Sequence, residues 1–387
     1  MNCMKRISVF SLCIGFLLCS EAHGQTEAPT RLPSLISSLH IPIPTELFGE
    51  RVPIENQEVR ERFEKELMIS LWDRPQVILW LKRSHRYLPH IEKMLKDNDL
   101  PEDLKYVAVA ESALRPHVRS GRGARGFWQF IAGTGRKYGL VINRRIDERR
   151  NIFASTRAAI QYFKDLHETF GSWTLAVAAF NMGEEGLMTE IMEQDSKNYY
   201  ELYLPLETQR FIFRILSVKM IFASPEKFGF KLNAEDYYSP LKFDRVEVTC
   251  EGEMPIRVVA KAAGTHFKMI KDLNPEIRGY YLAKGSHHIL VPEGASKGFE
   301  ARYQSAARDH LASEKEQIYF VKEGDSLSAI ADRFDVPLTS LILWNQLNPR
   351  RHIYPGQRLV IYPNNMKTDK TDSAQDENAR DSSGEKE

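Results

Sequence analysis

A glutamate on the apolar face of a predicted helix is the first candidate for chemistry. Pro101, followed by two acidic residues, is typical of a helix start, because proline suits the first turn and acids suit the positive end of the helix dipole. Glu111 falls seven residues after Leu104, on the same apolar face. Burial raises the pKa of a carboxyl, so Glu111 is a candidate general acid at neutral pH. A buried glutamate satisfied by a nearby arginine is the alternative interpretation.

A segment rich in glycine and aromatic residues follows this helix. Residues 120–130 read Ser-Gly-Arg-Gly-Ala-Arg-Gly-Phe-Trp-Gln-Phe. Small residues let a bulky ligand approach the backbone, aromatic rings can stack on sugar faces, and Ser120 and Gln129 can bond hydroxyl or acetamido groups. A tight turn into an aromatic core is the alternative. The three glycines also match the dinucleotide-binding pattern G-x-G-x-x-G, but no predicted strand precedes them, which argues against such a site.

The elements that must position these residues are helical. From about residue 58 to residue 235 apolar residues recur at helical spacing, as in the run from Ala159 to Phe170. Ser155 is the predicted N-cap of that helix and Gly171 its C-terminal stop. Residues 25–57 contain five prolines and predict an extended lead-in with little core of its own. The sequence therefore predicts an all-α catalytic domain over 58–235.

Beyond residue 240 the sequence changes to short β-rich pieces that repeat. Leu273-Asn274-Pro275 and the apolar strand after it echo Leu347-Asn348-Pro349 and its following strand. Each unit predicts a strand, two short helices and a strand. The predicted fold class is thus mainly α, a helical catalytic domain followed by small α+β modules of βααβ order at 246–294 and 318–363.

The ends of the chain and one connector are predicted to lie outside these domains. A basic start, a short apolar run and small residues mark residues 1–24 as a secretory signal peptide. Lipidation of Cys19 is the alternative, and membrane attachment is expected only in that case. Residues 295–317 predict a charged linker, and the polar residues 364–387 a disordered tail. Cleavage after residue 24 would leave Cys250 as the only thiol of the exported chain.

The charges of the chain nearly cancel overall but not locally. Lys and Arg number 53 and Asp and Glu number 52, a net charge of +1. Between Arg115 and Arg150, ten basic residues stand against two acidic ones, a net charge of +8. A basic region beside the candidate acid suits a polymer that carries carboxylates, although structural ion pairs are another use for these arginines. The predicted export and the overall balance argue against nucleic acid as a partner.

Several motifs, in the same order along the chain, resemble the lytic transglycosylase family, which has a lysozyme-like fold. They cover roughly residues 60 to 235 and comprise Glu111-Ser112, Ser120-x-x-Gly123-Ala124-x-Gly126-x-Trp128-Gln129-Phe130, Tyr138-Gly139-Leu140, Asp147-Glu148-Arg149-Arg150, Ala178-Ala179-Phe180-Asn181-Met182-Gly183 and Glu207-Thr208. The resemblance implies cleavage of the β-1,4 bond between MurNAc and GlcNAc in peptidoglycan. Glu111 would be the single catalytic residue, and the product would end in 1,6-anhydro-MurNAc.

The resemblance also implies substrate-binding residues. The family positions that contact substrate or line its cleft are matched by Ser120, Gln129, Phe180, Asn181, Met182 and Phe211. Phe180 and Phe211 stand where the family usually has tyrosine, and a lost neutral hydrogen bond is worth about 0.5 to 1.5 kcal/mol. Two alternatives therefore remain, a hydrolase like goose-type lysozyme that uses water, and a catalytically weak or silent scaffold that binds peptidoglycan.

The last predicted module, residues 318–363, resembles a LysM domain over its whole length. LysM domains bind N-acetylglucosamine polymers through the loops after the first strand and before the last. The implied glycan contacts are Gly324, Asp325, Ser326, Leu327, Asn345 and Ile353. The earlier unit, 246–294, looks like a degenerate LysM that lacks the Gly-Asp-Ser turn, and weaker binding is expected there.

Partners, cofactors and location follow from these resemblances. Peptidoglycan glycan strands are the expected partner, in the periplasm or at the outer membrane. No cofactor is expected. His287 and His288 are adjacent, which makes them poor paired ligands, and no cysteine–histidine spacing supports zinc, so no metal is expected either.

Overall fold

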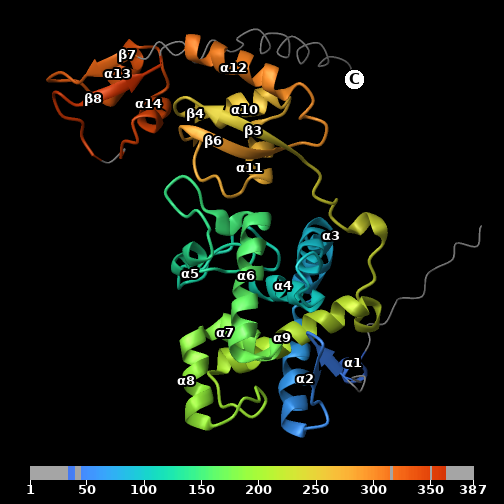
Figure 1. Cartoon of the computed structure of the whole chain (residues 1–387). Helices are drawn as coiled ribbons and strands as arrows, with labels where there is room; N and C mark the ends of the chain where they lie inside the picture. The colour runs from blue at the N-terminus through green and yellow to red at the C-terminus, as the bar shows by residue number, and fades with distance from the viewer. Residues whose placement is uncertain (1–33, 40–44, 314–316, 349–350, 363–387) are drawn as a thin grey trace, which may run out of the picture.

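The computed structural model describes residues 34–39, 45–313, 317–348 and 351–362 (Figure 1). A helical domain, up to about residue 240, is followed by a first module (242–313) and a second module (317–362). The predicted signal peptide and C-terminal tail lie outside the described residues. The predicted fold class, mainly helical with small α+β modules after the helical domain, is confirmed. Within the described residues, no helix is long and apolar enough to cross a membrane.

The helical domain contains nearly all of the long helices. Its elements are α1 (Leu35–Ser38), β1 (Thr45–Leu47), β2 (Glu50–Val52), α2 (Gln57–Trp72), α3 (Arg74–Lys96), α4 (Lys105–Ser112), α5 (Ala132–Lys137), α6 (Ile152–Phe170), α7 (Trp173–Met182), α8 (Glu184–Gln194) and α9 (Leu206–Ala223). Helix α6 ends at Gly171 in a left-handed conformation, as predicted. Its N-cap is Asn151 and not Ser155, because the Asn151 side chain accepts the first free backbone N–H groups while Ser155 is buried inside the helix.

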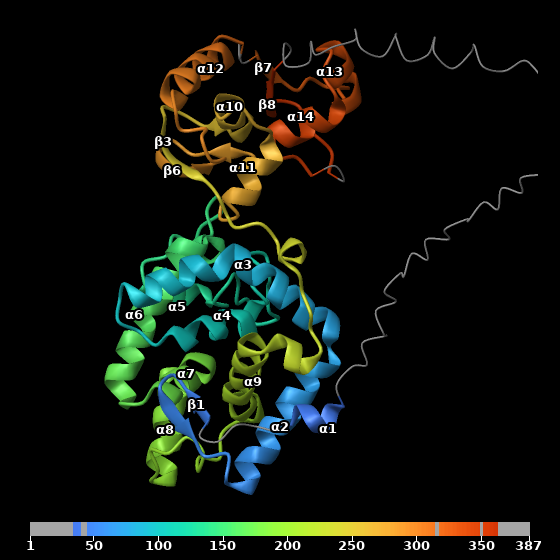
Figure 2. The same cartoon turned by 90° about the vertical axis from the view of Figure 1, so that its right-hand side faces the viewer.

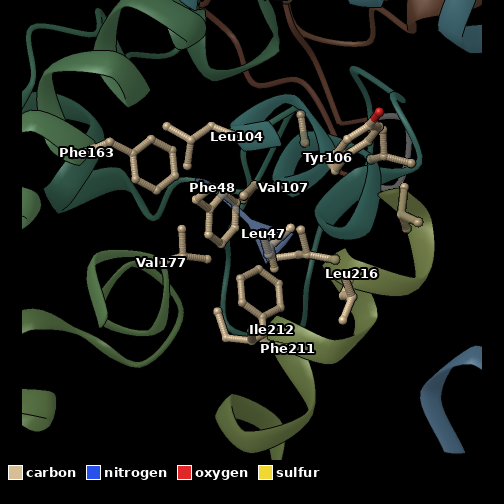
Figure 3. Packing of buried hydrophobic residues seen from close by; sticks show 14 of the residues in the cluster. Leu47, Phe48, Leu104, Tyr106, Val107, Phe163, Val177, Phe211, Ile212 and Leu216 are labelled. Carbon is tan, nitrogen blue, oxygen red and sulfur yellow. The ribbon is translucent and has the colours of Figure 1, made fainter. Parts of the chain in front are cut away.

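The predicted lead-in contributes to the core, so the expectation of little core there is wrong for its described part. Strands β1 and β2 form an antiparallel hairpin, and Leu47 and Phe48 are 0% and 2% exposed. Figure 3 shows Phe48 among the side chains of the helical core, near Val107 of α4 and Val177 of α7. The carboxylate of Glu50 accepts the backbone N–H groups of Trp173 and Thr174 and so caps α7. The hairpin thereby fixes the start of α7.

The two modules share one βααβ plan. The first contains β3 (Asp244–Cys250), β4 (Met254–Pro255), α10 (Ile256–Ala262), α11 (Phe267–Leu273), β5 (Tyr281–Leu282), β6 (Gly285–Val291) and α12 (Phe299–Ser313). The second contains β7 (Gln317–Phe320), α13 (Leu327–Arg333), α14 (Leu338–Trp344) and β8 (Arg358–Ile361). In both, the first and last strands of the plan pair antiparallel, β3 with β6 and β7 with β8.

One asparagine ties each module together. The Asn274 side chain donates to the carbonyls of Ile270 and Leu290 (2.7 and 2.8 Å) and accepts from the Leu290 N–H (2.8 Å). Asn345 makes the same three bonds to Leu341 and Val360. The structural equivalent of Asn274 is therefore Asn345, and not Asn348 as the repeated Leu-Asn-Pro suggested.

The connector predicted at 295–317 is largely a helix of the first module. Helix α12 packs on α10, and Phe299 and Tyr303 are each 2% exposed. The sequence prediction overlooked a buried stripe at helical spacing, because only two aromatic residues, two alanines and His310 form it among many charged residues. The first module consequently extends well past residue 294.

The paired asparagines generate a stability prediction. We expect Asn345→Ala to destabilise the second module by about 1 to 3 kcal/mol, because it leaves the Val360 N–H and C=O without their partner. Thermal unfolding of that module measures the change, with the exposed Ser328→Ala as the control. An unchanged melting temperature in Asn345→Ala would show that the amide does not hold the strands together.

Candidate active site

Glu111 lies at the C-terminal end of α4, where the chain turns sharply away. Most of the helix is buried, including Val107 and Ala108. Ala113 and Leu114 then adopt successive left-handed conformations (φ 52° and 57°), which end the helix. Glu111 remains partly exposed at this end, as a catalytic acid requires.

The surroundings of Glu111 favour its neutral form. Burial raises the pKa of Glu111 to about 7, the charge of Arg214 lowers that pKa and the charge of Glu207 raises it. The negative end of the α4 dipole acts in the same direction as burial, since it disfavours a carboxylate. At neutral pH the side chain is therefore divided between the acid and the carboxylate.

Arg214, on α9, is shared between two other acids. Its guanidinium lies 3.2 Å from Glu207 and 3.9 Å from Glu66 of α2. Glu66 is 2% exposed and also binds Arg210 at 2.5 Å. Because these carboxylates share the charge of Arg214, that charge only partly offsets the burial of Glu111.

Glu66 and Arg214 are not predicted from the sequence, and Glu207 is named there only within a family motif, with no role near Glu111. The sequence does contain a signal for Glu66, which lies seven residues after Val59 and three after Phe63 on the apolar face of its helix. Glu111 has the same kind of position on the apolar face of α4. Nothing in the sequence places α9 beside α4, so no local pattern could have predicted that Glu207 and Arg214 lie near Glu111.

The loop over residues 118–130, named the glycine loop, is held by its own backbone. Gly126 N–H donates to Val118 (3.2 Å) and Arg125 N–H to Phe130 (3.1 Å). The Ser120 hydroxyl accepts from the Ala124 N–H at 3.1 Å. Ser120 thus shapes the turn as well as lying on it.

Gln129 is held in a costly conformation within this loop. Its φ is 49°, and its side-chain amide donates to the carbonyl of Gly126 at 2.8 Å. A non-glycine residue in the left-handed region persists where surrounding structure enforces it, often at functional sites. Gln129 is partly exposed, so it remains a candidate for substrate contact.

The aromatic residues of the glycine loop belong to the core. Phe127, Trp128 and Phe130 are 1%, 0% and 3% exposed, and the Trp128 indole donates to Thr156 at 3.0 Å. The expectation that these rings stack on sugars is wrong, and the alternative of a turn into an aromatic core is correct.

A buried ion pair holds the glycine loop from beneath. Arg149 binds both carboxylate oxygens of Asp147 (2.7 and 2.8 Å) and donates to the carbonyls of Gly123 and Phe130 (both 3.1 Å). Gly126 lies so close that a Cβ there would be 1.6 Å from the Arg149 carbonyl oxygen, so only glycine fits. At least one arginine of the basic segment is therefore structural.

The remaining predicted cleft residues gather where α7 meets α9. Asn181 accepts from the Thr208 hydroxyl at 2.9 Å, and Met182 is partly buried at the end of α7. Phe180 stacks on Phe163 and contacts Phe130 edge-on, which links α7 to the glycine loop. Phe211 is 1% exposed and lies inside the core, as Figure 3 shows.

The predicted glycan residues of the second module mostly shape its loops. The Asp325 carboxylate accepts from the Tyr319 hydroxyl and the Lys322 N–H (2.6 and 2.8 Å), and Ser326 caps α13. Gly324 has a φ of 84°, Asn345 holds the strands, and Leu327 and Ile353 are partly buried against the module core.

A cavity of about 1000 Å³ lies between the helical domain and the first module, and Glu111 is not among its lining residues. His287 and His288 line it, and the His287 ring donates to the Ala283 carbonyl at 2.7 Å. In the part of the chain that the structure describes, no three His, Cys, Asp or Glu side chains group as a metal site would need.

Comparisons with known proteins agree with this architecture. Residues 89–203 match the transglycosylase SLT domain, residues 242–308 the LysM-like domain of lytic transglycosylase MltD, and residues 319–361 the LysM domain. The chain belongs to the lytic transglycosylase family, lyases that act on peptidoglycan.

Individual relatives are similar over most of the chain. Membrane-bound lytic murein transglycosylase D of Escherichia coli strain K12 is 32% identical over 321 residues, which cover 79% of this chain and 69% of that protein. Among solved structures, the 70 kDa soluble lytic transglycosylase of Escherichia coli aligns with a TM-score of 0.33 at 17% identity, over 46% of this chain and 32% of that enzyme.

The raised pKa of Glu111 generates a prediction about stability. A carboxyl whose pKa is higher in the folded state stabilises the fold least when ionised, so stability falls as pH rises from about 4.5 to about 7. We expect Glu111→Gln to be more stable than wild type at pH 8, by up to about 3 kcal/mol, and similar to it at pH 5.

Denaturant unfolding of both proteins at the two pH values measures this difference. Glu168→Gln, an exposed glutamate on α6, is the matched control and should show no pH-dependent gain. A Glu111→Gln difference that does not change between pH 5 and pH 8 would contradict the raised pKa.

Proposed function

We propose that the protein is an exported lytic transglycosylase that cleaves the MurNAc–GlcNAc β-1,4 bond and leaves a 1,6-anhydro-MurNAc end. The observation that carries the proposal is the Glu111 carboxyl, which has a pKa of about 7 and lies at the open end of a buried helix. A group with this pKa can give a proton in one step and take one in the next.

The proposed reaction requires only Glu111 and the substrate, and every proton and bond is accounted for. Protonated Glu111 donates its proton to the glycosidic oxygen, and the bond from that oxygen to C1 of MurNAc breaks. The resulting carboxylate takes the proton of the MurNAc C6 hydroxyl, whose oxygen bonds to C1. No water is consumed, and Glu111 returns to its protonated form.

The neighbouring charges support this single-acid mechanism. Glycosidases with two carboxylates need a second one free to act as base or nucleophile. The nearby Glu207 is paired to Arg214 at 3.2 Å, and Asp147 is buried against Arg149. A substrate hydroxyl acting as nucleophile makes a second carboxylate unnecessary.

The envelope location and the role of the second module are parts of the same proposal. Residues 1–24 have the pattern of a signal peptide, and a relative is described by name as membrane-bound. The LysM match of residues 319–361 supports binding of glycan strands, in loops shaped by Asp325 and Asn345. A tethered binding module raises the local concentration of the catalytic domain on the wall.

Analysis of digestion products tests the proposed function. We expect wild type to release fragments with anhydro ends from purified peptidoglycan, and Glu111→Gln to lose at least about 1000-fold in rate, because the only acid is gone. Mass spectrometry separates anhydro ends from reducing ends, which differ by one water. Reducing ends would indicate a hydrolase, and no products from folded wild type would indicate a silent scaffold.

The missing hydroxyl at Phe180 generates a second prediction. Phe180 is partly exposed, so Phe180→Tyr can add a hydroxyl at the α7 end of the site without repacking the core. One neutral hydrogen bond corresponds to a gain of about twofold to tenfold in turnover. Initial rates on peptidoglycan measure this, with Phe153→Tyr, a partly exposed ring elsewhere on the helical domain, as the control. An unchanged or lower rate would show that the hydroxyl has no role here.

A further inference from the structure

The first module contacts the helical domain through a short segment, residues 143–147, in addition to the packing of Phe243 and Arg245 on Phe153 of α6. The backbone N–H of Asp147 donates to the carbonyl of Glu276 at 2.9 Å, and the N–H of Arg278 donates to the carbonyl of Arg145 at 2.7 Å. Ile146 and Ile277 form an isolated β-bridge between these bonds. The contact is thus a two-stranded backbone pairing across the domain boundary.

Side chains strengthen this pairing at both ends. The Arg278 guanidinium donates to the carbonyl of Asn143 at 3.0 Å, and Arg145 forms an ion pair with Glu253. Ile277 and Glu276 are 3% and 7% exposed, so the centre of the contact is covered from solvent, while the flanking side-chain bonds are exposed. Figures 1 and 2 agree in placing α11, which precedes this loop, on the side of the first module that faces the helical domain.

The residues of the first module that make this contact correspond to its expected glycan-binding loops. Glu253 follows the first strand, β3, and residues 276–278 follow Asn274, just as the second module's predicted glycan loop follows Asn345. These residues, Glu253 and 276–278, are named the docking edge. In the first module this edge is occupied by the helical domain.

The segment that the docking edge contacts, residues 143–147, is bonded directly to the glycine loop. Asn143 fixes the turn by accepting from the N–H groups of Arg145 and Ile146 (2.8 and 2.9 Å). Asp147, at the end of the turn, binds Arg149, and Arg149 holds the carbonyls of Gly123 and Phe130. A continuous set of bonds therefore runs from Glu276 to the loop that carries Ser120 and Gln129.

We propose that the docking edge of the first module is a positioning surface for the glycine loop and not a glycan-binding site. Through Asp147 and Arg149 the module fixes the loop that lies against the substrate, which lowers the cost of ordering that loop for the reaction. Small displacements of positioning residues reduce turnover strongly, since reacting groups must be held within a fraction of an ångström. The effect on turnover rests on the proposed function, whereas the effect on loop order does not.

The test uses full-length Glu253→Ala/Arg278→Ala, which removes two exposed side-chain contacts of the docking edge and leaves the backbone intact. We expect turnover to fall about threefold to tenfold with KM unchanged, and hydrogen exchange at the Arg125 and Gly126 amides to rise. Co-sedimentation with insoluble peptidoglycan should equal that of wild type. Arg278→Lys, with Glu253 intact, keeps a donor near Asn143 and should recover most of the loss.

The matched control is Lys261→Ala/Asp309→Ala, another exposed ion pair of the same module, which lies off the docking edge. It should leave turnover and exchange unchanged, and equal melting temperatures of the two double variants exclude general unfolding. Reduced co-sedimentation with unchanged exchange would identify the edge as a glycan site and overturn the proposal. Unchanged exchange and turnover would overturn it as well. If wild type has no activity and the docking-edge variant still shows raised exchange at the Arg125 and Gly126 amides, the positioning role is supported. That result would count only against the proposed function.

Discussion

The buried ion pair between Arg149 and Asp147 is the interaction on which the geometry of the site depends. Removing two charges from water is costly unless hydrogen bonds replace the lost hydration. Here the bidentate contact and the carbonyls of Gly123 and Phe130 supply those bonds. The pair fixes the loop that carries Ser120 and Gln129, and the Asp147 backbone beside it is bonded to the first module. The backbone carbonyl of Arg149 lies so close to residue 126 that only glycine fits there. A single ion pair thus connects the glycine loop, the helical core and the neighbouring module.

Glu111 has a pKa near neutrality although no residue that the structure describes forms an ion pair with it alone. Burial raises its pKa, and a strong arginine contact would return that pKa to the ordinary range. Arg214 does not do so fully because Glu66 and Glu207 share its charge. The acids Glu66 on α2 and Glu207 on α9 therefore limit how far Arg214 lowers the pKa of Glu111. The packing of α2 against α9, which brings these residues together, thus contributes to that pKa.

Helical periodicity carried most of what could be predicted from the sequence. It located the helix of Glu111 and the run that ends at Gly171, since both depend on local spacing and capping. It could not distinguish rings that bind ligands from rings in the core, so sugar stacking and core packing were both open for Trp128, and the structure shows core packing. The burial of Leu47 and Phe48 could not be predicted from the proline-rich lead-in, because it depends on helices far along the chain. Partner elements, such as α9 beside α4, are set by tertiary packing and leave no local pattern.

The asparagine that closes each small module has a consequence for how such modules diverge. Asn274 and Asn345 join the end of a helix to the last strand through one amide, so the frame closes without help from the loops at its edge. Mutations can then accumulate in those loops with little effect on folding. Two modules with this frame can therefore bind different partners while each keeps its βααβ order.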